Sequence, residues 1–117
     1  MFNDDMTRIR HMLDSSMDAL SFIKNKQRND LDQDRMLVLS LVKCIEIIGE
    51  AASKISDDLK SKYPAIPWKD IIGMRNRLIH TYFDIDYDIV WKTVKYELLN
   101  LVDELKKLLS SNHIIEE

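Results

Sequence analysis

Residues 37–55 read LVLSLVKCIEIIGEAASKI, and this stretch decides the fold. Its apolar side chains recur every three or four residues and form two adjacent stripes, which is the spacing of an amphipathic helix. The first stripe comprises Leu37, Leu41, Cys44, Ile48, Ala51 and Ile55, and the second comprises Val38, Val42, Ile45, Gly49 and Ala52. So wide an apolar face predicts a helix that contacts more than one neighbour, and its small residues let another helix approach closely.

The segment before it predicts a first helix. Between residues 6 and 23 the apolar residues again follow helical spacing, at Met6, Ile9, Leu13, Met17, Leu20 and Ile23. The polar segment 24–34, KNKQRNDLDQD, predicts a connection. Asp30 or Asp32 within it is suited to cap the helix that follows.

The segments after it predict two more helices. Residues 56–67, SDDLKSKYPAIP, interrupt the pattern with room for a short extra helical turn, and Pro67 suits the first turn of a third helix. Asp84 or Asp86 is suited to cap a fourth helix, which precedes the polar tail SSNHIIEE. The third helix carries Trp68, Ile71, Ile72, Leu78 and Ile79, and the fourth carries Val90, Trp91, Val94, Leu98, Leu101, Leu105 and Leu108. The pattern predicts an all-α, up-and-down four-helix bundle, with residues 1–117 as a single domain.

Composition agrees with a helical globular protein. The chain has 117 residues, 45% of them hydrophobic and 32% charged, with two glycines and two prolines. A lone cysteine rules out an internal disulfide, and neither a signal peptide nor a membrane span is evident, so we expect a cytoplasmic protein. The net charge of −3 argues against a broad basic surface, and any contact with nucleic acid is therefore expected to be local.

Arg75 breaks the apolar stripe of the third helix, because it stands where that stripe should continue. An unpaired guanidinium on an apolar face is costly unless it is hydrogen-bonded or paired. A structural explanation is a pair with Glu46 or Glu50, or an aliphatic stem that carries the charge out to water. A functional explanation is an active site.

His80 follows Arg75 by five residues, about 140° around an ideal helix, so the two side chains do not share a face. Asn76 and His80 do share one. Convergence of Arg75 with His80 requires that the arginine swing round, that the helix end near His80, or that a second subunit complete the site. A histidine at a helix end, and Tyr82 beside Phe83, are also ordinary structural features.

Three parts of the chain resemble the HepT-like toxins of the HEPN superfamily, which are small all-helical prokaryotic proteins. They are IEIIGEAASKIS at 45–56, YPAIPWKDIIGMRNRLIHTYFDID at 63–86, and Trp91. The central motif, R-x4-H-x-Y, is formed here by Arg75, His80 and Tyr82, with the family's spacing and with Asn76 as the polar residue after the arginine. The similarity extends over nearly the whole chain.

The resemblance implies a metal-independent ribonuclease that needs no cofactor. It also implies a homodimer in which two copies of the motif face each other across a cleft. The partner it implies is a nucleotidyltransferase antitoxin of the MNT type, in a toxin–antitoxin system. That enzyme would silence the toxin by adenylylating Tyr82.

The residue types suit such chemistry. Histidine titrates nearest to neutral pH, so His80 is the candidate general acid or base. Arginine offers a permanently charged, planar set of donors for phosphate oxygens, so Arg75 is the candidate for the scissile phosphate. Asn76 is suited to orient His80. AMP on Tyr82 would obstruct RNA and add negative charge.

Other interpretations stay open at this point. His80, Asp84 and Asp86 could be metal ligands, although the aspartates also suit helix capping. Glu46 and Glu50 fit a solvated helix face or, with Arg77, the lining of a cleft. The chain could also be a non-catalytic helical binding subunit of a nucleotidyltransferase complex, or a dimeric scaffold.

Overall fold

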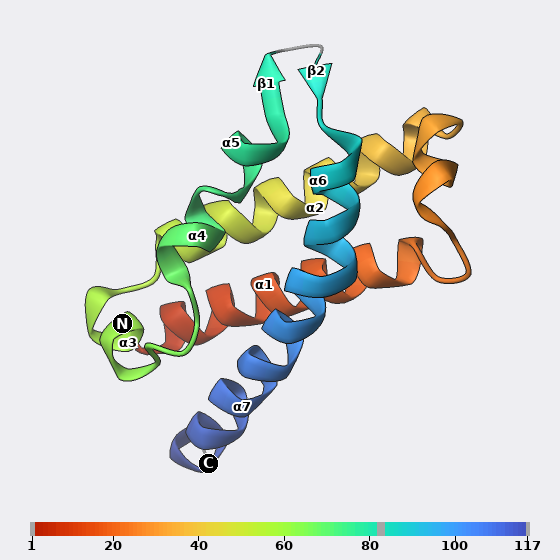
Figure 1. Cartoon of the computed structure of the whole chain (residues 1–117). Helices are drawn as coiled ribbons and strands as arrows, with labels where there is room; N and C mark the ends of the chain where they lie inside the picture. Colours follow the sequence, from red (N-terminus) through yellow and green to blue (C-terminus); the bar gives the residue numbers. More distant parts are fainter. Residues whose placement is uncertain (1, 82–83, 117) are drawn as a thin grey trace.

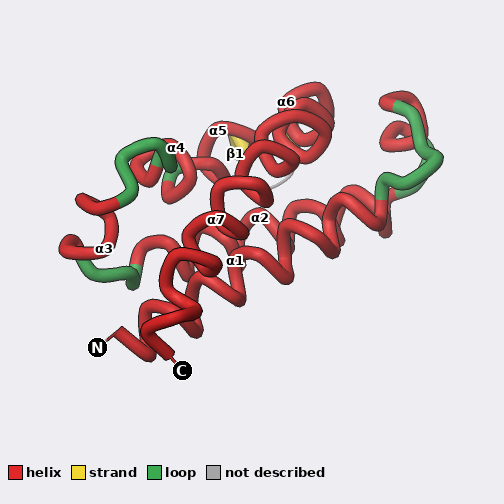
Figure 2. The backbone as a smooth tube through the Cα atoms, turned by 90° about the horizontal axis from the view of Figure 1, so that it is seen from below, coloured by secondary structure: helices red, strands yellow, loops and turns green. Residues whose placement is uncertain are grey.

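The computed structural model describes the backbone of residues 2–81 and 84–116, and the side chains of residues 4–79 and 84–112. These residues form an elongated, almost entirely helical molecule, as predicted (Figures 1 and 2). Helices α1 (Phe2–Phe22) and α2 (Arg35–Ser53) run antiparallel and pack along one another. A third rod, formed by α6 (Tyr87–Lys92), η2 (Thr93–Glu97) and α7 (Leu98–Glu116), packs against α1.

Helix α2 is the centre of the core. Its buried residues are those of the two predicted stripes: Leu37, Val38, Leu41, Val42, Cys44, Ile45, Ile48, Ala51 and Ala52. α2 contacts α1 as well as α4 (Trp68–Ile72) and α5 (Met74–Leu78), so the prediction of several neighbours is confirmed. Burial raises the pKa of the Cys44 thiol, which keeps this side chain neutral as a small core residue.

The buried face of α1 differs from the predicted one at Met17. This side chain is exposed, whereas Met12, Ser16 and Ala19 are buried. The prediction was wrong because helical spacing alone does not say which of two neighbouring faces meets the partner. Serine and alanine lie in the contact, and the longer methionine stays outside it.

The cap of α2 also differs from the prediction. Asp34 accepts a hydrogen bond from the Leu37 amide at 3.0 Å and begins the helix, instead of Asp30 or Asp32. Asp30 accepts from the Gln27 amide at 2.6 Å in the short 3-10 helix η1 (Arg28–Asp32). All three aspartates suit capping, so only the path of the chain selects one of them.

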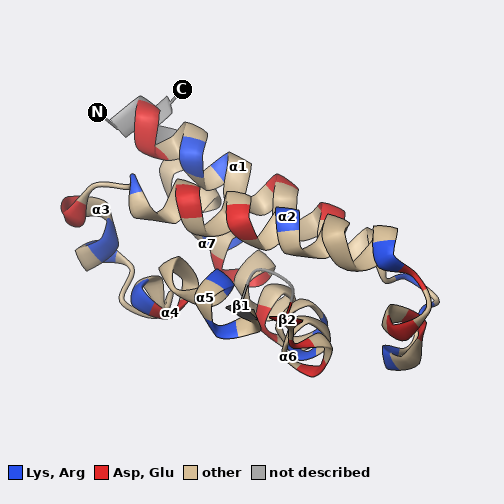
Figure 3. Ribbon diagram, turned by 90° about the horizontal axis from the view of Figure 1, so that it is seen from above, with Lys and Arg blue, Asp and Glu red and all other residues tan. Residues whose placement is uncertain are grey.

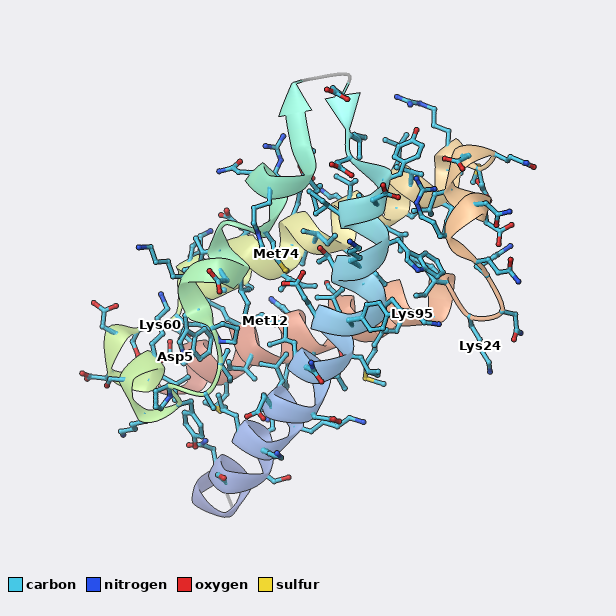
Figure 4. The ribbon with its side chains drawn as sticks, viewed as in Figure 1. Asp5, Met12, Lys24, Lys60, Met74 and Lys95 are labelled. Atoms are coloured by element: carbon cyan, nitrogen blue, oxygen red, sulfur yellow. The ribbon has the colours of Figure 1, made fainter. Side chains whose placement is uncertain are left out.

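A buried carboxylate ties the first helix to α3 (Asp57–Lys62), the short extra helix that was expected between the second and third helices. Asp5 accepts hydrogen bonds from the Ser56 amide at 3.0 Å and from the Ser56 hydroxyl at 2.6 Å (Figure 4). The Ser56 hydroxyl oxygen in turn accepts from the Leu59 amide at 3.2 Å and caps α3. Asp5 thus fixes the chain where it leaves α2.

The predicted third helix is two short helices, α4 and α5, separated by Gly73. α4 lies on α2 at Gly49, where an added Cβ would be 3.3 Å from the carbonyl oxygen of Ile71 and 3.4 Å from that of Ile72. A Cβ at these distances would be tighter than most Cβ contacts and would require the backbone of α4 to shift, so the expected role of the small residues is confirmed for Gly49. Glycine is a poor helix former, and the helix is interrupted at Gly73.

A hairpin, which was not predicted, follows α5. β1 (Ile79–Thr81) pairs antiparallel with β2 (Asp84–Ile85), so the third helical segment ends at Leu78 and not at Ile79. The Asp86 amide donates to the Leu78 carbonyl at 2.7 Å and closes the base of the hairpin. The Asp86 side chain accepts from the Ile89 amide and caps α6, as expected.

The polar tail is helical, contrary to prediction, because α7 continues to Glu116. Buried Asn112 explains how its polar residues are accommodated. Its side-chain amide donates to the Tyr63 hydroxyl at 2.9 Å and to the Leu108 carbonyl at 2.8 Å. The last turns of α7 are therefore held to the segment between α3 and α4.

The Asp5 hydrogen bonds make a prediction for stability. Asp5→Ala removes both acceptors of Ser56 and should lower the free energy of unfolding by about 2–3 kcal/mol. The measurement is urea denaturation followed by circular dichroism. Asp4→Ala is the matched control, since Asp4 is exposed and should change stability by less than about 0.5 kcal/mol. Equal losses in the two variants would contradict this role for Asp5.

Candidate functional site

A groove of about 740 Å³ runs over the surface of α2, with α1 on one side and the α4–α5 segment on the other. Here it is called the α2 groove. Its polar lining comes from α1 (Asp4, Thr7, Arg8, His11), α2 (Lys43, Glu46, Glu50, Ser53, Lys54) and α5 (Arg75, Asn76). Acidic and basic residues alternate along α1 and α2 (Figure 3), so the groove is not a surface of one charge.

Arg75 lies in this groove and pairs with Glu46. Its Nε donates to Glu46 Oε2 at 2.7 Å, which selects one of the two carboxylates that the sequence left open. The Arg75 side chain is 49% exposed and that of Glu46 34% exposed, so the expectation that Arg75 continues a buried stripe was wrong. The interruption at Gly73 turns this position out of the core.

The ion pair leaves most of the guanidinium available. Arginine has five N–H donors, and the bond to Glu46 uses only the one on Nε. No other hydrogen bond joins the Arg75 side chain to a residue whose side chain is described. Both Nη groups can therefore meet the oxygens of an anion while Glu46 fixes the orientation of the planar group.

Asn76 and Glu50 also lie in the groove, but neither of their side chains forms a hydrogen bond or an ion pair with the Arg75 side chain. The Asn76 amide nitrogen of the backbone donates to the Gly73 carbonyl at 3.1 Å, and its side chain is exposed. Glu50 pairs with Lys54 at 3.1 Å, one turn further along α2. Of the two glutamates considered for Arg75, only Glu46 is placed to hold it.

Arg77 does not line the α2 groove. Its Nη2 lies 3.4 Å from Glu97 Oε1 and donates to the Asp70 carbonyl at 3.4 Å. Glu97 is the last residue of η2, a π-helical turn within the α6–α7 rod, and it also accepts from the buried Thr93 hydroxyl at 3.3 Å. Arg77 thus connects α5 to that rod.

The backbone of His80 lies in β1, directly after α5 ends. α5 ends before this residue, which was one of the three conditions that would allow Arg75 and His80 to converge. The prediction that Asn76 and His80 share a helix face was wrong, because the helix does not reach His80. The His80 side chain and all of Tyr82 lie outside the described residues. Their roles therefore stay predictions.

A residue sixty positions earlier in the chain, Arg28, forms a clamp on the first turn of α6, just after the hairpin. Arg28 of η1 donates through Nε to Asp88 at 2.6 Å and through Nη1 to Asp32 at 3.1 Å. Its guanidinium also lies 5.9 Å from the centre of the Tyr87 ring. The hydrogen bonds to Asp88 and Asp32 raise the pKa of Arg28, which stays charged. The clamp holds the first turn of α6, which follows β2 in the chain.

No group of three metal-binding side chains is present in the part of the chain whose side chains are described. Asp86, one of the residues considered as a ligand, serves as the cap of α6. Within the same ranges, no helix combines the length and apolar character that crossing a bilayer requires.

The sequence reading did not identify Arg8 and His11, which α1 contributes to the groove. Both lie on a helix more than sixty residues before the motif. Their three-residue spacing places them on one face. Nothing in the sequence says that this face lies beside Arg75.

Most of this chain is similar to known proteins. A family model described as "Ribonuclease HepT-like" matches residues 12–109. A candidate RNase of Methanocaldococcus jannaschii is 41% identical over 92 residues, which are 79% of this chain and 76% of that protein. One from Caldanaerobacter subterraneus is 34% identical over 101 residues, or 86% and 90% of the two chains. A candidate ribonuclease HepT of Thermococcus cleftensis is 40% identical over 75 residues, or 64% and 68%. No solved structure shows a significant similarity.

The Arg75–Glu46 pair makes a prediction that a double-mutant cycle can test. Both side chains are partly exposed, so their coupling in the cycle Glu46→Ala, Arg75→Ala should be about 0.2–1 kcal/mol of unfolding free energy. The matched cycle pairs Glu50→Ala with Arg75→Ala, and its coupling should be near zero. A larger coupling with Glu50 would mean that Arg75 turns to that carboxylate in solution.

Proposed function

This chain belongs to the HepT-like ribonuclease family, and from that premise we propose that it is a metal-independent endoribonuclease acting on cytoplasmic RNA. The relatives named above are RNases by name, and the family match includes most of the α2 groove. The observation that carries the proposal is Arg75, held by Glu46 at one nitrogen and with both Nη groups available in the groove.

Arg75 binds the scissile phosphate in this proposal. Its two Nη groups can contact two phosphate oxygens at once, and its fixed charge stabilises the additional negative charge of the phosphorane-like transition state. Glu46 keeps the guanidinium oriented through Nε and is too weakly coupled to hold it away from a phosphate, because both side chains are partly exposed. Glu46 is thus a positioning residue for Arg75.

His80 transfers protons in the same reaction. As general base it would remove the proton of the 2′-hydroxyl, whose oxygen attacks phosphorus and forms a 2′,3′-cyclic phosphate. The P–O5′ bond breaks, and the leaving oxygen needs a proton from a general acid. We propose a homodimer in which the second histidine, from the other copy, supplies that proton. Asn76, exposed on α5 four residues before His80 in the sequence, is proposed to orient the imidazole.

We also propose that the protein is the toxin of a toxin–antitoxin system. Its partner would be an MNT-type nucleotidyltransferase that adenylylates Tyr82. An adenylyl group two residues beyond His80 would bring a phosphate and a base to the hairpin, where they would exclude RNA by bulk and by charge. The motif spacing R-x4-H-x-Y supports this part of the proposal.

RNA cleavage by the purified protein in EDTA tests the ribonuclease proposal. We expect wild-type protein to cut tRNA or mRNA and to leave 2′,3′-cyclic phosphate ends. Arg75→Ala should lower kcat by about 10²–10³-fold through loss of transition-state stabilisation. His80→Ala should lower it by about 10²–10⁴-fold through loss of proton transfer.

Arg10→Ala is the control for the cleavage assay, because Arg10 is an exposed arginine of α1 that does not line the groove. It should cleave at the wild-type rate. Full activity in Arg75→Ala and His80→Ala would show that other residues catalyse the reaction. No activity in wild-type protein would favour a non-catalytic binding subunit.

Co-expression with the proposed partner, an MNT-type nucleotidyltransferase, tests the regulatory proposal. Intact-mass spectrometry should show one or more added adenylyl groups, and peptide mapping should place them on Tyr82. The Tyr82→Phe variant should stay unmodified and active, while the nearby Tyr87→Phe variant should be modified as wild type is. An unmodified Tyr82 in an inhibited complex would leave inhibition to occlusion by the partner.

A further inference from the structure

We infer that Arg8 and His11 of α1 form a second phosphate subsite in the α2 groove, which binds an RNA phosphate other than the one that is cut. This inference rests on the ribonuclease function proposed above. It adds to that function a pair of residues that determine how strongly a longer strand binds.

Arg8 differs from the other cations of the groove because it has no acidic partner among the residues whose side chains are described. The three others each lie within 4.0 Å of a glutamate: Lys43 and Arg75 share Glu46, and Lys54 pairs with Glu50. No hydrogen bond or ion pair joins Arg8 to another residue of the described ranges, although Asp4 lies one turn before it on the same helix. Arg8 is also half-buried at the wall of the groove.

A guanidinium that no described side chain pairs is a favourable place for an anion. His11, exposed one turn further along α1, lines the same groove and can donate a hydrogen bond to the same ligand. The glutamates on the floor repel an anion less than their number suggests, because each already has a cationic partner. The α1 wall therefore offers a guanidinium that no described carboxylate pairs, with Asp4 as the acidic residue on the same wall.

The shape of the groove indicates which kind of anion it would bind. α2 separates Arg8 from Arg75, and the groove of about 740 Å³ reaches both, so one ligand that occupies it must carry charges at two separated positions. The same groove is also lined by two partly exposed apolar side chains, Ile47 of α2 and Ile72 of α4, which are 38% and 40% exposed. Two phosphates with an apolar base face between them are what single-stranded RNA offers.

Cleavage kinetics on two substrates test the subsite. A dinucleoside monophosphate has only the scissile phosphate, while a single-stranded oligoribonucleotide has others beside it. Arg8→Ala should raise KM for the oligoribonucleotide about 10-fold, the equivalent of one charge-assisted hydrogen bond, and leave kcat unchanged. The same variant should leave kcat/KM for the dinucleoside monophosphate unchanged. Arg8→Lys should recover most of the lost affinity.

Arg10→Ala is the matched control here too, since it removes the same charge from α1 outside the groove. It should leave both substrates unaffected. His11→Gln should raise KM for the oligoribonucleotide by a smaller factor than Arg8→Ala. Circular dichroism of each variant verifies that α1 is folded.

Binding measurements separate this inference from the proposed chemistry. With fluorescent single-stranded RNA and the His80→Ala protein, log Kd should rise linearly with log salt concentration. The added Arg8→Ala substitution should weaken binding and lower that slope by about 0.7, the value for one lost phosphate contact on a single strand. Added Arg10→Ala should change neither quantity.

The outcomes are distinct. If wild-type protein does not cut RNA but Arg8→Ala still weakens RNA binding, the ribonuclease proposal fails and the subsite stands. If RNA is cut but Arg8→Ala behaves as Arg10→Ala does, the subsite is refuted and the catalytic proposal stands. If wild-type protein neither cuts nor binds RNA, both are refuted, and a protein ligand becomes the occupant to test.

Discussion

The close contact between Gly49 and the backbone of α4 sets the geometry on which the groove depends. The carbonyl oxygens of Ile71 and Ile72 lie 3.3 and 3.4 Å from the position that a Cβ atom at residue 49 would occupy. The α4–α5 segment can therefore rest directly on α2, and Arg75 comes within 2.7 Å of Glu46, one turn before Gly49. A larger residue at position 49 would move α4 outward and with it the arginine. The same contact that completes the core thus places the Arg75 guanidinium in the α2 groove.

The α2 groove combines charges of both signs, and their pairing decides what it can bind. Its two floor glutamates are each matched by a cation, so the groove is locally near neutral along α2. In the proposals above, anions bind at the walls, at the Nη groups of Arg75 and at Arg8. This arrangement explains how a chain with a net charge of −3 can offer a site for a polyanion without a broad basic surface.

The hairpin that carries His80 is supported on both sides. At its base, the Asp86 amide is bonded to the Leu78 carbonyl, and Arg28 holds the first turn of α6 through Asp88. On the other side, Arg77 joins α5 to the π-helical turn η2 through Glu97. Turns of π-helix occur often near functional sites, and here the turn supplies the carboxylate that meets α5. Such support on both sides suits a hairpin that carries the histidine proposed above as general acid or base.

By itself, the sequence determined the helical class, the buried stripes of α2, a close approach at its small residues, an aspartate cap for α6 and the short extra helix α3. These follow from spacing and from local capping chemistry, which act within a few residues. Tertiary structure alone decided that Gly73 divides the third helix, that a hairpin follows Leu78, that Asp34 caps α2, and that α7 continues through its polar tail to Asn112 and Tyr63. It also decided that Arg75 pairs with Glu46 and not with Glu50, and that Arg8 and Arg75 line the same groove. In each case the deciding contact joins residues distant along the chain or selects among equally suitable neighbours, and periodicity carries no information about either.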